Sequence, residues 1–249
     1  MLEIHKLSAR VGGKVFLREL DLQLPSSTLT ALVGRNGSGK STLLGCIGGT
    51  KSYRGDILLC GEELRRIPLR ERAKRMALLP QTLAAPHITV EELTSLGRSP
   101  YVDVGRRLTA EDREAVCRAM ETAGVAELCG RFVDELSGGE RQRAFLAMIL
   151  AQETELLLLD EPTAHLDAVC GDAFMRTLAQ LRQQGKTLLV VMHDLTEAVR
   201  YADRMAVMDS GRMVFGGSRE ECLSCGILEQ TLGVKRYEAD GRSFFAAME

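Results

Sequence analysis

The sequence predicts an α/β fold in three parts: an N-terminal antiparallel β subdomain, a core of alternating strands and helices, and a helical subdomain inserted into that core. Three observations support this prediction. Apolar residues alternate before residue 25, short apolar runs precede or follow helical segments at 28–47 and 156–192, and residues 86–152 show helical spacing without a clear strand. With 249 residues, the chain can bury a substantial core.

The first elements are expected to form a β-hairpin. Gly12-Gly13 supplies its turn, and alternating apolar residues on both sides of that turn would share one face: Leu2, Ile4, Leu20, Leu22 and Leu24. Residues 53–60 are expected to add another strand, which Gly61 ends.

Residues 34–42 fit the phosphate-binding pattern G-x-x-x-x-G-K-[ST]. A predicted strand at 28–33 precedes them and a predicted helix at 41–47 follows, so backbone N–H groups and the helix dipole would surround an anion. Lys40 would reach the outer phosphates, and Ser41 would offer its hydroxyl to Mg²⁺. A flexible glycine turn before Lys-Ser is the alternative. The predicted core is therefore a P-loop NTPase core of the RecA-like type, whose candidate loop residues are Gly34, Arg35, Asn36, Gly37, Ser38, Gly39, Lys40, Ser41 and Thr42.

The middle block is predicted to be helical, with helices at 110–123 and 144–151. Between them, Leu136-Ser137-Gly138-Gly139-Glu140 carries a capping box of Ser137 and Glu140 that would start a helix over 141–151. Glycine costs up to about 1 kcal/mol relative to alanine inside a helix. Two adjacent glycines at this helix start therefore suggest that a phosphate approaches the backbone closely.

Two carboxylates follow the next predicted strand, at 156–159. Open α/β sheets bind ligands at the carboxyl ends of their strands. Asp160 would hold Mg²⁺ through water, and Glu161 would orient and deprotonate the water that attacks the γ-phosphate. Two solvated acids after a strand are the alternative.

The α/β pattern then continues to residue 217. Phe174, Leu178 and Leu181 would lie on one face of a helix, 187–192 would form a buried strand, and 205–208 with 213–215 would form a hairpin. Strands that alternate with helices indicate a largely parallel sheet. The polar segment after Gly217 has no assigned element.

Composition excludes some classes of function. A formal net charge of −2 argues against broad attraction to nucleic acid, and no apolar run approaches the length of about 18 residues that a membrane span needs. The first residues lack the pattern of a signal peptide. Seven scattered cysteines suit a reducing compartment, and the pair Cys222/Cys225 is too few ligands for a closed zinc site. A solvated helix face is favoured over a docking surface for one basic cluster: Arg65, Arg66, Arg70, Arg72, Lys74 and Arg75.

Taken together, these motifs resemble the nucleotide-binding subunit of ATP-binding cassette (ABC) transporters over nearly the whole chain. Six motifs occur in the family's order: Walker A (34–42), the Q-loop glutamine Gln81, the signature (136–140), Walker B with the catalytic glutamate (156–161), the D-loop Ala164-His165-Leu166-Asp167, and the switch histidine His193. Six ordered motifs are far more specific than any one of them.

The resemblance implies one ABC ATPase domain over residues 1–249. Its expected parts are a β and RecA-like core (1–85 and 153–220), a helical signature subdomain (86–152) and a C-terminal tail (221–249). It also implies a head-to-tail dimer, in which Walker A of one copy and the signature of the other enclose each ATP. The residues that would contact a nucleotide held by the partner copy, or complete its site, are Ser137, Gly138, Gly139, Glu140 and Asp167.

The resemblance also assigns the remaining roles. His193 would contact the γ-phosphate and position Glu161, while Gln81 would join the Mg²⁺ shell and report the nucleotide state to a membrane partner. One position departs from the family, because Val11 stands where an aromatic side chain usually stacks on adenine. Such stacking contributes roughly 1–3 kcal/mol per base, so we expect weak discrimination between ATP and GTP.

Several segments are similar to importers of iron–siderophore, haem and cobalamin: 97–101, 107–112, 151–154, 193–195 and 200–203. The expected function is ATP hydrolysis that drives uptake of an iron–siderophore complex through a partner permease, at the cytoplasmic face of the membrane, with a substrate-binding protein as an indirect partner. A non-transport ABC-type ATPase of cofactor assembly or repair is the alternative. A regulator without turnover is disfavoured because Glu161 and His193 are present.

Overall fold

An antiparallel sheet opens the chain, in the strand order β2-β1-β4-β5. Its predicted hairpin is confirmed, because β1 and β2 pair Leu2 with Leu24 and Ile4 with Leu22, and all four of these side chains are buried. The computed structural model describes residues 1–103, 105–164, 166–239 and 242–248, without the side chains of Val11 and Arg242. The bounds of the sheet's strands are β1 Leu2–Val11, β2 Lys14–Leu24, β4 Arg54–Leu59 and β5 Glu62–Glu63.

This sheet belongs to the first of two compact units, which comprises residues 1–67 and 182–249. The same unit contains the strands β3, β8 and β9, paired in parallel on both sides of β3, and β10, which is antiparallel to β9. Every residue of β8 is buried, which explains the apolar run 188–191 that follows Thr187. These strands span Leu29–Gly34 (β3), Thr187–Val191 (β8), Arg204–Asp209 (β9) and Arg212–Ser218 (β10).

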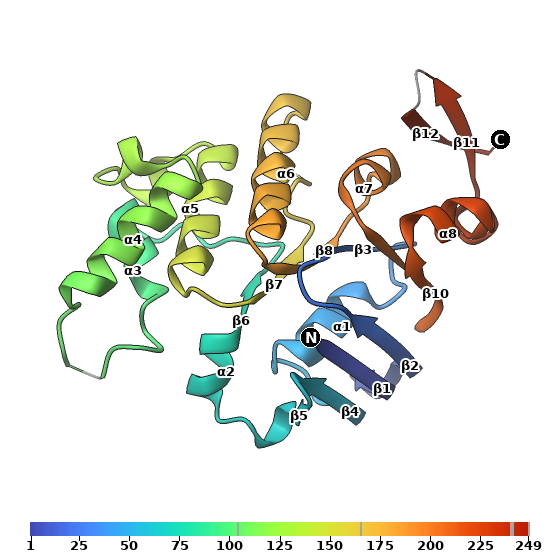
Figure 1. Cartoon of the computed structure of the whole chain (residues 1–249), viewed down its shortest axis with the longest axis horizontal. Coiled ribbons are helices and arrows are strands. Elements are labelled where there is room, and N and C mark those ends of the chain that lie inside the picture. Colours follow the sequence, from blue (N-terminus) through green and yellow to red (C-terminus); the bar gives the residue numbers. More distant parts are fainter. Residues whose placement is uncertain (104, 165, 240–241, 249) are drawn as a thin grey trace. The chain divides into compact units, whose positions relative to one another are not determined.

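The helices of the first unit are short, and α1, α7 and α8 each follow a strand (Figure 1). The tail that had no assigned element forms two of them and a terminal hairpin. Their bounds are η1 Leu64–Arg66, α1 Lys40–Ile47, α7 Leu195–Tyr201, α8 Arg219–Ser224 and α9 Ile227–Leu232, with β11 Val234–Ala239 and β12 Arg242–Ala247. Burial raises the pKa of the Cys222 thiol in α8 to about 12, so this thiol stays protonated at neutral pH. The Cys225 thiol donates to the Cys222 carbonyl at 3.4 Å.

The second unit, residues 68–181, holds a pair of parallel strands and a cluster of helices. The strands β6 and β7 pair from Met76 with Leu156 to Leu79 with Leu159. Helices α3, α4 and α5 pack together (Figure 1). The bounds are α2 Leu69–Arg75, β6 Met76–Leu79, α3 Val90–Leu96, α4 Ala110–Thr122, η2 Ala126–Leu128, η3 Val133–Glu135, α5 Gly138–Ala151, β7 Leu156–Asp160 and α6 Ala168–Gln183, the last two residues of α6 belonging to the first unit.

The expected helical character of residues 86–152 is confirmed for the described part of this segment, which contains an isolated bridge between Thr89 and Phe132 and no longer strand. Capping boxes begin several helices: Thr89/Glu92, Thr109/Asp112, Ser137/Glu140 and Ser218/Glu221. The helix α5 starts at Gly138, three residues before the start that the sequence indicated, because Ser137 caps it.

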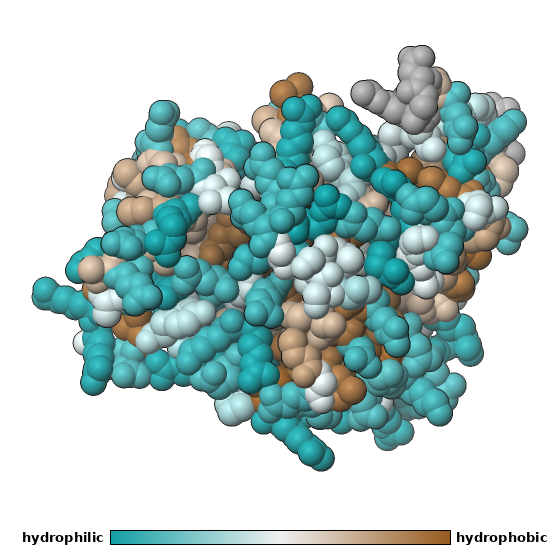
Figure 2. Space-filling model, viewed as in Figure 1, coloured by the Kyte–Doolittle hydropathy of each residue, from teal (hydrophilic) through white to brown (hydrophobic). Residues whose placement is uncertain are grey.

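Apolar side chains are concentrated inside each unit, and the face shown in Figure 2 is mostly hydrophilic with small apolar patches. The predicted apolar stripe of α6 is buried, with Phe174, Leu178 and Leu181 at most 3% exposed. Among the described residues, no helix combines the length and the apolar character that a membrane crossing requires.

Candidate functional site

The phosphate-binding loop connects β3 to α1 and depends on glycine at particular positions. Gly37 and Gly39 have φ values of 79° and 105°, in the left-handed region that glycine adopts without strain. A Cβ on Gly39 would lie 2.8 Å from the side chain of Leu17 and 3.1 Å from the carbonyl oxygen of Phe16. Neither the backbone angle nor the available space admits a larger residue at position 39.

The turn of the β9–β10 hairpin braces this loop. The N–H of Gly211 donates to the carbonyl of Ser38 at 3.0 Å, and the carbonyl of Gly211 accepts from the N–H of Arg18 at 2.9 Å. A Cβ on Gly211 would lie 2.3 Å from the carbonyl oxygen of Phe16. The sequence indicated the hairpin through Ser210-Gly211 but carried no signal that its turn packs on the loop.

Lys40 is 6% exposed and its ammonium lies over the loop backbone. It donates to the carbonyls of Gly34 at 2.8 Å and Arg35 at 3.3 Å. These contacts hold a full positive charge beside the start of α1, where the helix dipole adds to it.

The start of α1 differs from that of most other helices in the chain. Its N-cap, Gly39, provides no side-chain hydrogen bond, and its first turn has no acidic residue. The hydroxyl of Ser38 is buried without a hydrogen-bond partner. Because a buried polar group normally has a partner, these groups fit a phosphate that would accept from them. Side-chain caps are present instead at α3, α4, α5, α7 and α8, from Thr89, Thr109, Ser137, Asp194 and Ser218.

The two predicted carboxylates lie at the end of β7. Asp160 is 8% exposed, and Glu161 follows it with φ 51°, which is uncommon for a residue other than glycine. The amide of Gln81 donates to the Glu161 carboxylate at 2.5 Å. The structure thus brings together two predicted site residues that are 80 positions apart in the sequence.

The signature segment forms the start of α5, and its capping box is confirmed. The N–H of Glu140 donates to the Ser137 hydroxyl at 3.3 Å, while the Glu140 carboxylate accepts from the Ser137 hydroxyl at 2.7 Å and from its N–H at 2.9 Å. These hydrogen bonds lower the pKa of Glu140. A Cβ on Gly139 would make only an ordinary contact of 3.5 Å with Leu166, so packing within the chain does not require glycine there.

The D-loop aspartate caps α6. Its carboxylate accepts from the N–H groups of Val169 at 3.0 Å and Cys170 at 2.8 Å, and the bond from Cys170 is the main reason that the pKa of Asp167 is lowered. His165 lies outside the described residues. His193 is exposed after β8. The neighbouring Asp194 carboxylate accepts from the N–H groups of Thr196 and Glu197 and therefore acts as the cap of α7.

The candidate residues are divided between the two units. The phosphate loop and His193 belong to residues 1–67 and 182–249, and the others belong to residues 68–181. The proposed ligands of Mg²⁺ are the Ser41 hydroxyl, the Gln81 amide and the Asp160 carboxylate. All three can offer hard oxygen atoms, which is the ligand type that this cation prefers, and water would complete its shell.

Known proteins similar to this chain share both sequence and fold with it. The sequence pattern of the ABC transporter family matches residues 17–164. The iron(3+)-hydroxamate import ATP-binding protein FhuC of Bacillus subtilis is 39% identical over 94% of this chain and 88% of FhuC. The ferric enterobactin transport ATP-binding protein FepC of Escherichia coli is 38% identical over 93% and 86%. The hemin import ATP-binding protein HmuV of Pseudomonas fluorescens is 39% identical over 94% and 93%.

Solved structures show the same fold at lower identity. An inward-facing ABC transporter described as of the metal-chelate type aligns with a TM-score of 0.85 at 23% identity, over 100% of this chain and 97% of the other. A dimeric bacterial ABC transporter cassette aligns with a TM-score of 0.77 at 24% identity, over 88% and 99%. Because the family pattern covers more than half of the residues and these relatives align along most of their length, the chain belongs to the ABC transporter family and is one of its ATP-hydrolysing cassettes.

Proposed function

We propose that this chain powers the uptake of iron–siderophore complexes, as a homodimer bound to a permease at the cytoplasmic face of the membrane. The observation that supports the cargo class is the similarity to FhuC and FepC, which are named for ferric siderophores, along more than nine-tenths of this chain. Haem is the second candidate cargo because the similarity to HmuV is equally extensive. Cobalamin remains a prediction from the subfamily resemblance.

ATP is proposed to bind with its phosphates on the loop of residues 34–42. Lys40 supplies charge, and backbone N–H groups at the start of α1, where the N-cap Gly39 offers no side-chain acceptor, supply hydrogen bonds. Ser41, Gln81 and Asp160 would hold Mg²⁺, which neutralises charge that develops on the phosphates. Glu161 takes a proton from the attacking water, and Gln81 holds that carboxylate in place at 2.5 Å. His193 is proposed to contact the γ-phosphate and position Glu161.

A second copy is proposed to complete each site with the tip of its α5. Ser137, Gly138 and Gly139 would contact the γ-phosphate held by the partner, and Glu140 and Asp167 would keep that surface ordered. Glycine at position 139 supports this role, because the fold of a single chain does not require it. The existence of a dimeric cassette with the same fold supports the proposed dimer.

Light scattering of the Glu161→Gln variant with ATP and Mg²⁺ tests the dimer, and we expect a mass twice that of the chain. A monomer under these conditions, and also in the presence of the permease, contradicts it. Reconstitution with the permease and its binding protein tests the cargo, with ferric hydroxamate, haem and cobalamin compared in parallel. Failure to co-purify with any polytopic membrane protein would favour the non-transport alternative.

A further inference from the structure

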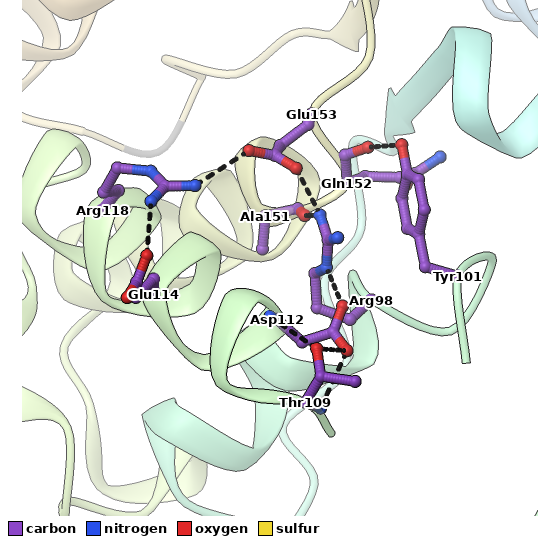
Figure 3. A network of polar contacts seen from close by, with 9 residues as sticks. All are labelled: Arg98, Tyr101, Thr109, Asp112, Glu114, Arg118, Ala151, Gln152 and Glu153. Atoms are coloured by element: carbon purple, nitrogen blue, oxygen red, sulfur yellow. Dashed lines mark hydrogen bonds and ion pairs between the residues drawn. The ribbon is translucent and has the colours of Figure 1, made fainter. Parts of the chain in front are cut away.

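An ion-pair network centred on a buried arginine anchors the C-terminal end of α5 (Figure 3). Its centre is Arg98, which follows α3 and is 4% exposed. The guanidinium pairs with Asp112 at 2.9 Å and with Glu153 at 2.7 Å, and it donates to the carbonyl of Ala151 at 2.9 Å. One side chain therefore joins the segment after α3, the first turn of α4 and the end of α5.

Tyr101 adds a second contact at the end of α5, to Gln152, the residue that follows Ala151. Its ring lies against the Arg98 guanidinium, 4.0 Å from the ring centroid, and its hydroxyl donates to the carbonyl of Gln152 at 2.9 Å. Two carbonyls at the end of α5, those of Ala151 and Gln152, thus have fixed donors. These contacts fix the backbone of Gln152 relative to α5. They therefore limit the groups that the side-chain amide of Gln152 can contact.

The side chain of Gln152 is hydrogen-bonded to the backbone at the start of β6. Its amide donates to the carbonyl of Met76, the first residue of β6, at 3.0 Å, and also to the carbonyl of Ala73 in α2. The strand has only four residues and ends at Leu79, two residues before Gln81. On the partner strand β7, Leu159 pairs with Leu79, and Glu161 follows two residues later.

We propose that Gln152 is a positioning residue for ATP hydrolysis, which sets the start of β6 and thereby the approach of Gln81 to Glu161. The inference rests on the proposed role of Glu161. A slip of β6 by one residue would shift the end of the strand, and with it the segment that carries Gln81, by about 3.3 Å. A hydrogen bond of 2.5 Å to Glu161 does not survive such a shift.

The helix α5 connects the hydrogen bonds of Gln152 to the signature segment. The helix α5 begins at Gly138, after Ser137, and ends at Ala151, beside Gln152. Its 14 residues span about 21 Å as one rigid element. A displacement of α5 therefore moves the Gln152 amide, which is hydrogen-bonded to β6. Gln152 thus connects the start of α5, which is proposed to contact the partner's nucleotide, with Glu161, which is proposed to act in this chain.

The test compares Gln152→Met with wild type, because methionine has a similar length but no N–H donor. We expect kcat to fall by about 10–100-fold while KM for ATP and the affinity for nucleotide change less than about twofold, since the defect misplaces a reacting group. Thr94→Val is the matched control. It removes a hydrogen bond from a buried side chain to the Val90 carbonyl, a bond that lies within α3 in the same cluster of helices, and its kcat should stay near that of wild type.

A double-mutant cycle separates positioning from a general loss of stability. If Gln152 acts through Gln81, Gln152→Met should lower kcat by less than about twofold in a Gln81→Ala background, whereas independent effects would multiply. Should Gln152→Met fail to fold, Tyr101→Phe removes only the bond to the Gln152 carbonyl and is expected to show the same dependence on Gln81 with a smaller effect.

Multiplicative effects, or a kcat of Gln152→Met equal to that of the Thr94→Val control, would overturn the inference. Such a result would leave the proposed function intact if Glu161→Gln still abolished turnover. Retained turnover in Glu161→Gln would instead remove the proposed function on which the inference rests.

Discussion

The amide of Gln81 donates to the carboxylate of Glu161 across 2.5 Å, although the two residues are 80 positions apart. An amide cannot accept the proton that a general base removes, so Gln81 can orient this carboxylate but cannot replace it. Glu161 also adopts a left-handed backbone conformation, with φ 51°, directly after the buried β7. Strained residues of this kind are held by their surroundings and occur often at functional sites.

Glu161→Gln is expected to retain ATP binding and to lose about 10²–10⁴-fold in kcat. The glutamine keeps the shape of the side chain but cannot take a proton from water. Steady-state phosphate release and equilibrium titration with a fluorescent ATP analogue measure the two properties separately. Near-normal hydrolysis by this variant would remove Glu161 from the role.

Lys40→Ala is expected to weaken ATP affinity by about 10–150-fold, because hydrogen bonds to a charged group contribute roughly 1.5–3 kcal/mol. Equilibrium titration with the fluorescent ATP analogue measures this affinity. Lys14→Ala is the control, since Lys14 is an exposed lysine at the start of β2. Unchanged affinity in Lys40→Ala would contradict the assigned contact with the phosphates.

Gly211→Ala is expected to weaken ATP binding although residue 211 lies outside every nucleotide motif. Its φ of 82° disfavours alanine, and the new Cβ would lie 2.3 Å from the Phe16 carbonyl, which forces the turn away from the phosphate loop. Gly105→Ala is a matched control because Gly105 has the same φ of 82° and no atom within 4 Å of the added Cβ. Equal ATP affinities of the two variants would show that the contact between the β9–β10 turn and the phosphate loop does not affect ATP binding.

Asp112→Asn is expected to lower the free energy of unfolding by about 1.5–3 kcal/mol at pH 7, by the loss of a charge-assisted bond to Arg98. Burial alone would raise the pKa of Asp112, but hydrogen bonds from Thr109 and Arg98 outweigh it, and the pKa lies below its ordinary value. The carboxylate therefore stabilises the folded chain above the pKa of the unfolded state, about 4, and this contribution is lost as the pH falls through the lower folded pKa.

Urea unfolding from pH 7 to pH 3 tests this prediction as a difference between Asp112→Asn and wild type. The difference is needed because Glu153, which faces the same guanidinium, also has a lowered pKa and adds its own pH dependence to the stability of both proteins. A difference in stability that stays constant below pH 4 would rule out the ion pair as its source.

Discrimination between ATP and GTP is expected to be weak, because Val11 cannot stack on a base. The ratio of kcat/KM for the two nucleotides should lie within about tenfold, and Val11→Tyr should tighten ATP binding by roughly 1–3 kcal/mol. The side chain of Val11 lies outside the described part of the chain, so this prediction depends on the sequence alone. A strong preference of the wild type for ATP would refute it.

Much of this fold could be predicted from the sequence because its signals are local. Alternating leucines set the β1–β2 register, glycine spacing defined the phosphate loop, and Ser137 with Glu140 marked the start of α5. The helices α8 and α9 could not be assigned, since elements of six residues are too short to show a helical period. A capping box at Ser218 and Glu221 was the one signal available for α8.

By itself, the sequence determined the local motifs and their order, and it predicted which residues would carry the chemistry, because a phosphate loop or a capping box lies within a few adjacent residues. Only the tertiary structure decided which distant groups meet. Gly211 contacts the Ser38 backbone, Gln152 holds the start of β6, and Arg98 joins three separate segments. These contacts form only when packing brings distant elements together. The local sequence around one residue of such a pair therefore does not predict its partner.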